Sequence, residues 1–314
     1  MKFGIDIPNG WKMSLVDIKD PVEAYEAMTN IVTTGDELGY DSAWVVDHFH
    51  TVPTPTQEIT FECMMMLAAL ARDTKNIRIG QIVLCNSYRN PALLAKMAST
   101  LDVLSHGRLN FGIGAGWYEH EYKAYGYPYP DAPERLRMLR EALKVIHAMW
   151  SQEEAVFEGK YYQVRGAINQ PKGVQKPHIP ILIGGSGEKV TLKLVALYGD
   201  ACNVGGDLKT LQHKLEVLKG HCENVGRNFS DIHVTTGTYC SIADTDEEAL
   251  ALVPEARKNG LADTALVGSP ATIRERIATL EAHGVHELII DFPFPSAKNL
   301  EPLRRFAKEF IHKL

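Results

Sequence analysis

Two stretches of the chain carry residues whose types and spacing could do chemistry. The first, residues 180–188 (PILIGGSGE), is an apolar run that breaks into glycines and reopens as a predicted helix at Glu188. Glycine lets the backbone take positive φ and lets a ligand approach the main chain, and the free N–H groups of a helix start favour an anion. We therefore predict a phosphate-binding turn, with a plain strand-to-helix turn as the alternative. Its candidate cofactor-binding residues are Gly184, Gly185, Ser186 and Gly187.

The second stretch follows the predicted strand Ser42–Val46 and places Asp47, His48 and His50 just beyond its end. An imidazole can exchange a proton near neutral pH, and a neighbouring carboxylate could orient the ring, as acid–base catalysis requires. This pattern predicts His48 as a catalytic residue and Asp47 as its support. The alternative is structural, with His48 bonded to a neighbouring loop at the strand end.

Further strand ends offer surfaces rather than reactive groups. The end of the predicted strand Ile77–Leu84 is apolar and could contact one face of an aromatic ring. The ends of the predicted strands Leu109–Ile113 and Ala201–Val204 consist of small residues that permit a ligand to approach closely. The glycines of residues 112–116 lack the spacing of the dinucleotide-binding fingerprint. The aromatic and acidic residues 117–122 would suit a wall beside a planar ligand. The candidate cofactor-binding residues at these ends are Val83, Leu84, Cys85, Gly114, Ala115, Gly116, Gly205 and Gly206.

Short β-rich runs alternate with amphipathic helical segments along the whole chain, which favours a parallel sheet. Eight strand–helix pairs predict a single (β/α)8 TIM barrel over residues 1–314, an α/β fold whose active site lies at the carboxyl ends of the strands. A doubly wound sheet is the alternative. The predicted strands are Phe3–Ile7, Ser42–Val46, Ile77–Leu84, Leu109–Ile113, Ile181–Ile183, Ala201–Val204, His233–Tyr239 and Glu287–Ile290.

Several segments between these strands have recognisable features. Apolar residues recur at three-to-four spacing in the helical segments near residues 25–38 and 136–150, and Pro91, Pro133 and Pro270 mark three helix starts, where a missing N–H costs nothing. Insertions at the carboxyl-terminal mouth are predicted at residues 116–131, 157–176 and 246–259. The second of these is predicted to begin with a β-hairpin that turns at Gly159.

Composition excludes several classes of protein. The 314 residues are 45% hydrophobic and 23% charged with a net charge of −6, which fits a soluble enzyme and offers no basic field for nucleic acid. The five cysteines lie far apart, so neither a disulfide framework nor a zinc cluster is expected. No apolar span of about 18 residues and no signal segment is present, so we expect no membrane insertion and a cytoplasmic location.

Three longer motifs together resemble one family. They are residues 38–48 (LGYDSAWVVDH), residues 105–117 (SHGRLNFGIGAGW), and residues 180–187 followed by 197–203 (LYGDACN). The chain resembles the luciferase-like superfamily of flavin and deazaflavin enzymes over nearly its whole length, and more narrowly the oxidoreductases that use coenzyme F420. The resemblance implies a (β/α)8 barrel with the cofactor ring at the mouth, its phosphate at the glycines, and a bulge near Ile82 and Val83, often with a non-proline cis peptide.

The same resemblance implies roles for single residues. It places His48 near the reactive edge of the cofactor, supported by Asp47, to position or protonate substrate. The sugar-phosphate dehydrogenase branch has a tryptophan shortly after this histidine and an acid directly after the fourth-strand glycines. Here these places hold Val52 and Trp117. A sugar-phosphate substrate is therefore not expected, and Glu119 stands as a positional substitute for the missing acid.

Three functions follow in order of preference. The first is hydride transfer between F420 and a small organic substrate. The second is an FMN-dependent monooxygenase of the same superfamily, which would need a separate reductase. The third is a metal-dependent hydrolase, for which His48 and His50 would need further ligands at later strand ends, where Asp291 alone is suitable; no metal is expected. The resemblance also implies a homodimer.

Overall fold

Parallel strands close into a barrel in the computed structural model of the protein, which describes residues 1–293 and 297–311. The eight strands of the barrel wall correspond to the eight predicted strands, so the predicted (β/α)8 barrel is confirmed. The third of them consists of two short strands, β3 and β4, which both pair with β5. The pairing of β9 with β10 closes the barrel. In order around the barrel the strands are β1 (Lys2–Asp6), β2 (Ser42–Val45), β3 (Arg78–Gln81) with β4 (Leu84–Cys85), β5 (Leu109–Gly114), β8 (Ile181–Gly184), β9 (Ala201–Asn203), β10 (His233–Ile242) and β12 (Glu287–Asp291).

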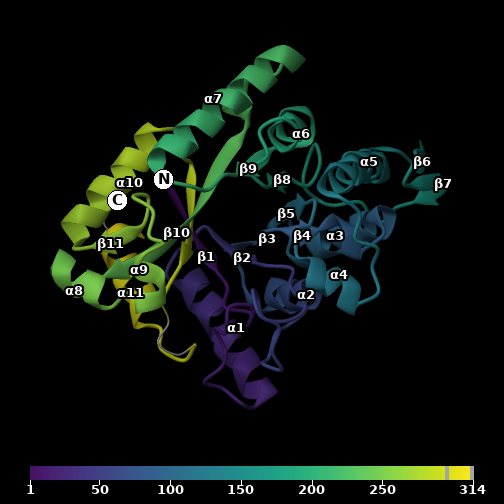
Figure 1. The fold of residues 1–314 in the computed structure, drawn as a ribbon. Coiled ribbons are helices and arrows are strands. Elements are labelled where there is room, and N and C mark those ends of the chain that lie inside the picture. Colours follow the sequence, from purple (N-terminus) through teal and green to yellow (C-terminus); the bar gives the residue numbers. More distant parts are fainter. Residues whose placement is uncertain (294–296, 312–314) are drawn as a thin grey trace.

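Helices surround the barrel and bury one apolar face each against it (Figure 1). In α5 the buried residues Leu139, Leu143 and Ile146 keep the three-to-four spacing read from the sequence. The three marked prolines lie in the first turns of α3, α5 and α10, as predicted. The surrounding helices are α1 (Pro21–Glu37), α2 (Cys63–Asp73), α3 (Pro91–Leu104), α5 (Ala132–Ser151), α6 (Thr191–Tyr198), α7 (Leu208–Val225), α10 (Pro270–Ala282) and α11 (Glu301–Phe306).

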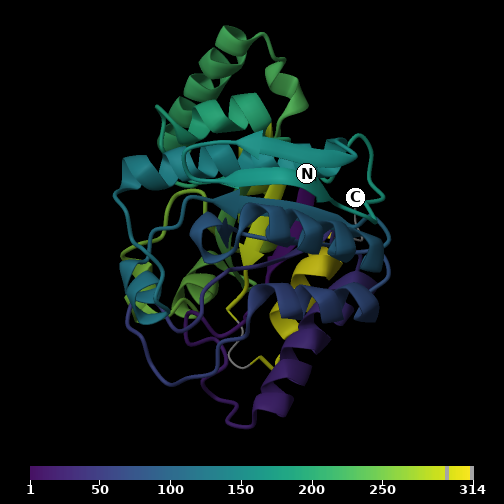
Figure 2. The same cartoon turned by 90° about the vertical axis from the view of Figure 1, so that its right-hand side faces the viewer.

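Within residues 1–293 and 297–311, no helix combines the length and the apolar character that crossing a membrane would require. The views in Figures 1 and 2 place α7 and α1 at opposite ends of the molecule. Shorter helical turns complete the chain: η1 (Asn86–Tyr88), η2 (Phe229–Asp231) and a π-helical turn, η3 (Ala307–Ile311).

The three predicted insertions are present. The first contains α4 (Glu119–Ala124), and the third contains α8 (Asp246–Ala251) and α9 (Glu255–Lys258). The hairpin of the second begins earlier than predicted, as β6 (Glu154–Glu158) and β7 (Gln163–Ile168), and projects beyond α5 at the edge of the molecule (Figures 1 and 2). A short strand that the sequence did not predict, β11 (Leu266–Gly268), pairs with the far end of β10.

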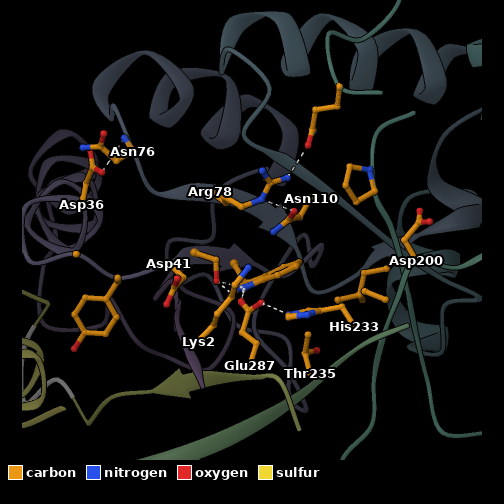
Figure 3. A pocket seen from close by; sticks show the side chains of 18 residues that line it. Lys2, Asp36, Asp41, Asn76, Arg78, Asn110, Asp200, His233, Thr235 and Glu287 are labelled. Carbon is orange, nitrogen blue, oxygen red and sulfur yellow. Dashed lines mark hydrogen bonds and ion pairs between the residues drawn. The ribbon is translucent and has the colours of Figure 1, made fainter. Parts of the chain in front are cut away.

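A cavity of about 630 Å³ opens at the amino ends of the strands (Figure 3). Among the described residues it shares no lining residue with the cavity at the predicted active site. Its central carboxylate, Glu287, accepts hydrogen bonds from Ser42, from the Trp44 indole at 3.0 Å and from His233 at 2.9 Å. Arg78 donates to the side chains of Asn110 and Gln175 and to backbone carbonyls. Because these polar groups satisfy one another across neighbouring strands, this end of the barrel serves stability.

Candidate active site at the mouth of the barrel

The third strand of the barrel is interrupted between β3 and β4. The peptide bond between Ile82 and Val83 is cis, as the family resemblance implied. The Val83 side chain lies against Gly114 and Gly184, so that a Cβ built on either glycine would come within 2.8 Å of a Val83 methyl group. These two glycines therefore make room for the bulge, and Val83 forms part of the cavity wall in front of them.

A cavity of about 350 Å³ adjoins this bulge at the carboxyl ends of the strands, and its lining is more apolar than polar. It brings together most of the residues singled out in the sequence, with an aromatic wall formed by Trp11, Trp117 and Tyr118. The predicted residues that line it are Asp47, His48, Val83, Leu84, Cys85, Gly114, Ala115, Gly116, Gly184 and Gly185.

The glycine turn opens into the same cavity through Gly185, whose φ of +121° is a conformation that L side chains rarely adopt. Helix α6 begins at Thr191, not at Glu188 as predicted. Residues 188–190 form a wider turn, which the Leu192 amide closes by donating to the Gly187 carbonyl at 3.0 Å. Within the described part of the chain no side chain caps this helix start, so its first amides remain suited to an anion.

His48 is fixed from two sides. Its Nδ1 lies 2.9 Å from a carboxylate oxygen of Glu121, and its ring stacks on Trp11 with centroids 5.1 Å apart and an interplanar angle of 6°. Glu121 also accepts hydrogen bonds from the Phe49 amide and the Tyr88 hydroxyl. The neutral His48 ring therefore carries its proton on Nδ1, and Nε2 is the atom left for a ligand.

Glu121 is fully buried yet ionised. Burial raises the pKa of its carboxyl group, but the hydrogen bond and charge of His48, together with the Phe49 amide and the Tyr88 hydroxyl, lower that pKa below its ordinary value. A carboxylate that accepts this many bonds has little freedom to rotate. Glu121 therefore holds both the orientation and the tautomer of His48.

The sequence suggested that Asp47 orients the ring of His48, but in the structure Asp47 does not contact that ring. Its two oxygens accept a bidentate pair of bonds from Arg89 at 2.7 and 2.8 Å, and one of them also accepts from the Cys85 amide. The reason is geometric: adjacent side chains along an extended chain point to opposite sides. Asp47 joins the end of β2 to the segment after β4 and supports the site indirectly.

Glu119 lies outside the cavity. It is on the exposed side of α4, where it pairs with Lys123 at 2.7 Å. Glu121, two residues later in the same helix, was missed by the sequence reasoning although it lies in the acidic and aromatic run already noted. A helix turns about 200° over two residues, so Glu119 and Glu121 face opposite ways.

Other predicted residues lie around the cavity or apart from it. Ser186 and Gly187 follow Gly185 in the same turn and are exposed, outside the lining of the cavity. Gly205 and Gly206 do not line this cavity; Gly206 has a φ of +132°, and a Cβ built on it would come within 2.9 Å of the Thr210 side chain in the first turn of α7. Cys85 lies 3.0 Å from the Tyr122 hydroxyl, and burial raises the pKa of its thiol to about 12, so it is no nucleophile at neutral pH.

The geometry gives no support to the metal-hydrolase alternative. His50 turns away from His48, and its Nε2 lies 3.1 Å from Nδ1 of His120. Asp291 is paired with Arg257 instead. Over residues 1–293 and 297–311, no three histidine, cysteine or acidic side chains are grouped so that they could hold one metal ion.

Comparison with known proteins agrees with this architecture. The family model for luciferase-like monooxygenases matches residues 1–259. An uncharacterised protein of Mycobacterium tuberculosis is 39% identical over 142 residues, which are 45% of this chain and 49% of that protein. The chain thus spans about half the length of the first curated relatives it matches. An F420-dependent glucose-6-phosphate dehydrogenase of Amycolatopsis mediterranei is 31% identical over 68% of this chain and 65% of its own length.

A solved structure extends the comparison to the full barrel. The crystal structure of a monooxygenase from Streptomyces bottropensis superposes with a TM-score of 0.82 over 99% of both chains, at 21% sequence identity. At this level of identity the likeness establishes the fold alone.

Proposed function

The chain belongs to the luciferase-like monooxygenase family, and from this premise we propose that it transfers a hydride between coenzyme F420 and a small organic substrate. One observation carries the proposal: His48, held by Glu121, lines the same cavity as the Ile82–Val83 bulge and Gly185. A proton-exchanging group, a flat apolar wall and an anion-binding turn thus share one space. The similarity to an F420-dependent dehydrogenase supports this choice of cofactor.

The cavity fits a flat ring carrying a phosphate. The ring would lie against Val83, Leu84 and Cys85, with Gly114, Ala115 and Gly116 beside it, because this wall is apolar and bulges towards the cavity. The phosphate would lie at Gly184, Gly185, Ser186 and Gly187. A side chain at Gly185 would meet Thr191 at 3.3 Å and would fill this cradle. When bound, the deazaflavin ring supplies the hydride chemistry, and the protein supplies orientation and charge.

His48 would handle the proton that accompanies hydride transfer. With Nδ1 held by Glu121, its Nε2 can accept a proton from a substrate hydroxyl or, when protonated, donate one to a substrate oxygen. The stacked Trp11 ring keeps the imidazole in one plane and shields it from water. Glu121 would stabilise the charged ring, since it stays ionised next to it.

The test of the proposal is a titration of the purified protein with F420 and, separately, with FMN, followed by fluorescence. We expect saturable binding of F420 at micromolar concentration and binding of FMN that is weaker by tenfold or more. Tight binding of FMN without binding of F420 would overturn the proposal.

The second candidate is an FMN-dependent monooxygenase, favoured by the family model that matches residues 1–259, which describes luciferase-like monooxygenases. In that case a separate reductase would have to supply reduced FMN. The same titration distinguishes the two candidates, because a monooxygenase of this kind should bind FMN more tightly than F420.

We also propose that the protein is a single-domain homodimer of the cytoplasm. The five cysteines are buried and unpaired, which suits a reducing compartment, and the dimer follows the resemblance to its family. Light scattering should give twice the mass of one chain at micromolar concentration. A mass of one chain would reject the dimer.

A further inference from the structure

The mouth extends beyond the His48 cavity. Trp11, Val46 and Ile82 line both that cavity and a second one of about 380 Å³, which lies at the ends of β1 and β12 and beside the middle of β10. Its polar lining includes Asp6, which ends β1, and Asp291, which ends β12. These strands are neighbours, with Ile5 opposite Ile290, so barrel closure brings the two carboxyl groups together from opposite ends of the sequence.

Two buried polar atoms in this second cavity have no hydrogen-bond partner within residues 1–293 and 297–311. They are Oδ1 of Asp6 and the hydroxyl oxygen of Tyr239. Tyr239 is only 9% exposed, and burial raises its pKa to about 12, so it keeps its proton and can donate it. Buried polar atoms in folded proteins are nearly always hydrogen-bonded, and both residues line the cavity. A bound molecule would therefore find one acceptor and one donor unused.

The cations around these atoms already have partners. Arg257 pairs with Asp291 at 2.6 Å and also lies 4.8 Å from the centre of the Tyr239 ring. Lys12 lies 4.2 Å from the centre of the Trp11 ring. Among residues 1–293 and 297–311 Asp6 has no ion-pair partner, and burial together with the charge of Asp291 raises its pKa and favours its protonated form. An anionic ligand such as a phosphate or carboxylate would have to compete with Asp291 for Arg257, whereas a neutral ligand would leave that ion pair intact.

We propose that Asp6 and Tyr239 form a substrate subsite that binds a hydroxyl group, and that the substrate is a small neutral hydroxyl compound. A hydroxyl group is both a donor and an acceptor, so it can donate to Oδ1 of Asp6 and accept from Tyr239. The apolar lining of the cavity, Val46, Ile82 and Ile289, would contact the carbon skeleton. This inference rests on the proposed function for the reaction, but the binding itself requires no cofactor.

The experiment compares two probes that differ in the recognised group, cyclohexanol and cyclohexanecarboxylate, by saturation-transfer NMR with the cofactor-free protein. We expect the alcohol to bind at millimolar concentration and the carboxylate to bind at least tenfold more weakly. Asp6→Asn and Tyr239→Phe should each weaken binding of the alcohol about tenfold. The exposed Asp17→Asn is the matched control and should leave binding unchanged.

The affinity of each variant for F420 is measured in parallel. Unchanged F420 affinity together with weakened alcohol binding supports the subsite. Equal binding of the two probes, or alcohol binding unaffected by both substitutions, overturns it. Loss of F420 affinity in Asp6→Asn overturns it too, because Asp6 would then contact the cofactor. If wild-type protein binds the alcohol but no F420, the subsite stands and the proposed cofactor fails.

Discussion

His48 and Glu121 act as a pair, although they are 73 residues apart in the chain. The carboxylate holds Nδ1, so the reactivity of Nε2 depends on a residue that need not touch the substrate. Glu121 is therefore a positioning residue. Two substitutions separate the roles of ring and carboxylate.

We predict that His48→Ala retains F420 affinity while kcat falls roughly 10²- to 10⁴-fold, the usual contribution of a positioned acid or base. Glu121→Gln should keep the ring in place but lose its charge, so it should lower kcat and shift the pH profile of kcat without changing KM. Both are measured by steady-state kinetics across pH. If His48→Ala keeps its turnover and only melts at a lower temperature, the residue is structural.

Asp6 predicts a pH dependence of stability. Burial, and secondly the charge of Asp291, raise its pKa from 3.8 to about 7, against the opposing effects of Lys12 and Arg257. The folded state thus binds a proton that the unfolded state has lost. The free energy of unfolding therefore decreases as the pH rises from the pKa of Asp6 in the unfolded state towards its pKa in the folded state. From pH 5 to pH 8 this decrease should be on the order of 2 kcal/mol.

Urea unfolding of Asp6→Asn and wild type at pH 5 and pH 8 measures this cost. We expect the stability of the variant relative to wild type to be greater at pH 8 than at pH 5, by on the order of 2 kcal/mol. An equal difference at the two pH values would show that Asp6 titrates normally.

At the scale of elements, the turn between β8 and α6 is the feature that the proposed phosphate requires. We predict that Gly185→Ala weakens F420 binding tenfold or more, because the φ of +121° is strained for alanine and the methyl group would meet Thr191. Gly220→Ala in α7, where a Cβ would meet no atom of the described residues within 4 Å, is the control and should leave binding unchanged. Fluorescence titration measures both. Unchanged affinity in a folded Gly185→Ala would show that these glycines serve only as a turn.

For the whole molecule, the two ends of the barrel have separate tasks. At the amino end, burial raises the pKa of Glu287, but hydrogen bonds from His233, Ser42 and Trp44 have the larger combined effect and lower that pKa. The ionised carboxylate therefore links β12 to β2 and β10. We predict that Glu287→Ala costs about 3 kcal/mol, since it leaves buried partners unpaired. F420 affinity at the mouth should stay within twofold of wild type.

Chemical unfolding at pH 7 measures this cost, with Glu216→Ala on the exposed side of α7 as the control. Because a lowered pKa stabilises the fold only above the unfolded value, the penalty should shrink as the pH falls towards 4. A Glu287→Ala variant as stable as the control would show that the network contributes nothing.

The sequence by itself determined the barrel and the strand ends that form its mouth. The alternation of strands and helices follows from the local apolar pattern, so all eight barrel strands were predicted. The positions of His48, Gly185 and the bulge at Ile82–Val83 followed from the strand ends and the family motifs. Whether α6 would begin at Glu188 or Thr191 was not readable, because a glycine turn allows several backbone paths.

Only the tertiary structure decided which side chains act together. Asp47 is adjacent to His48 in sequence but bonds Arg89, whereas the distant Glu121 holds the ring, because side-chain direction alternates along the chain and α4 folds back over the mouth. Asp6 and Asp291 meet because β12 pairs with β1 when the barrel closes. A closed barrel joins the first strand to the last, and no local pattern of residues records that contact.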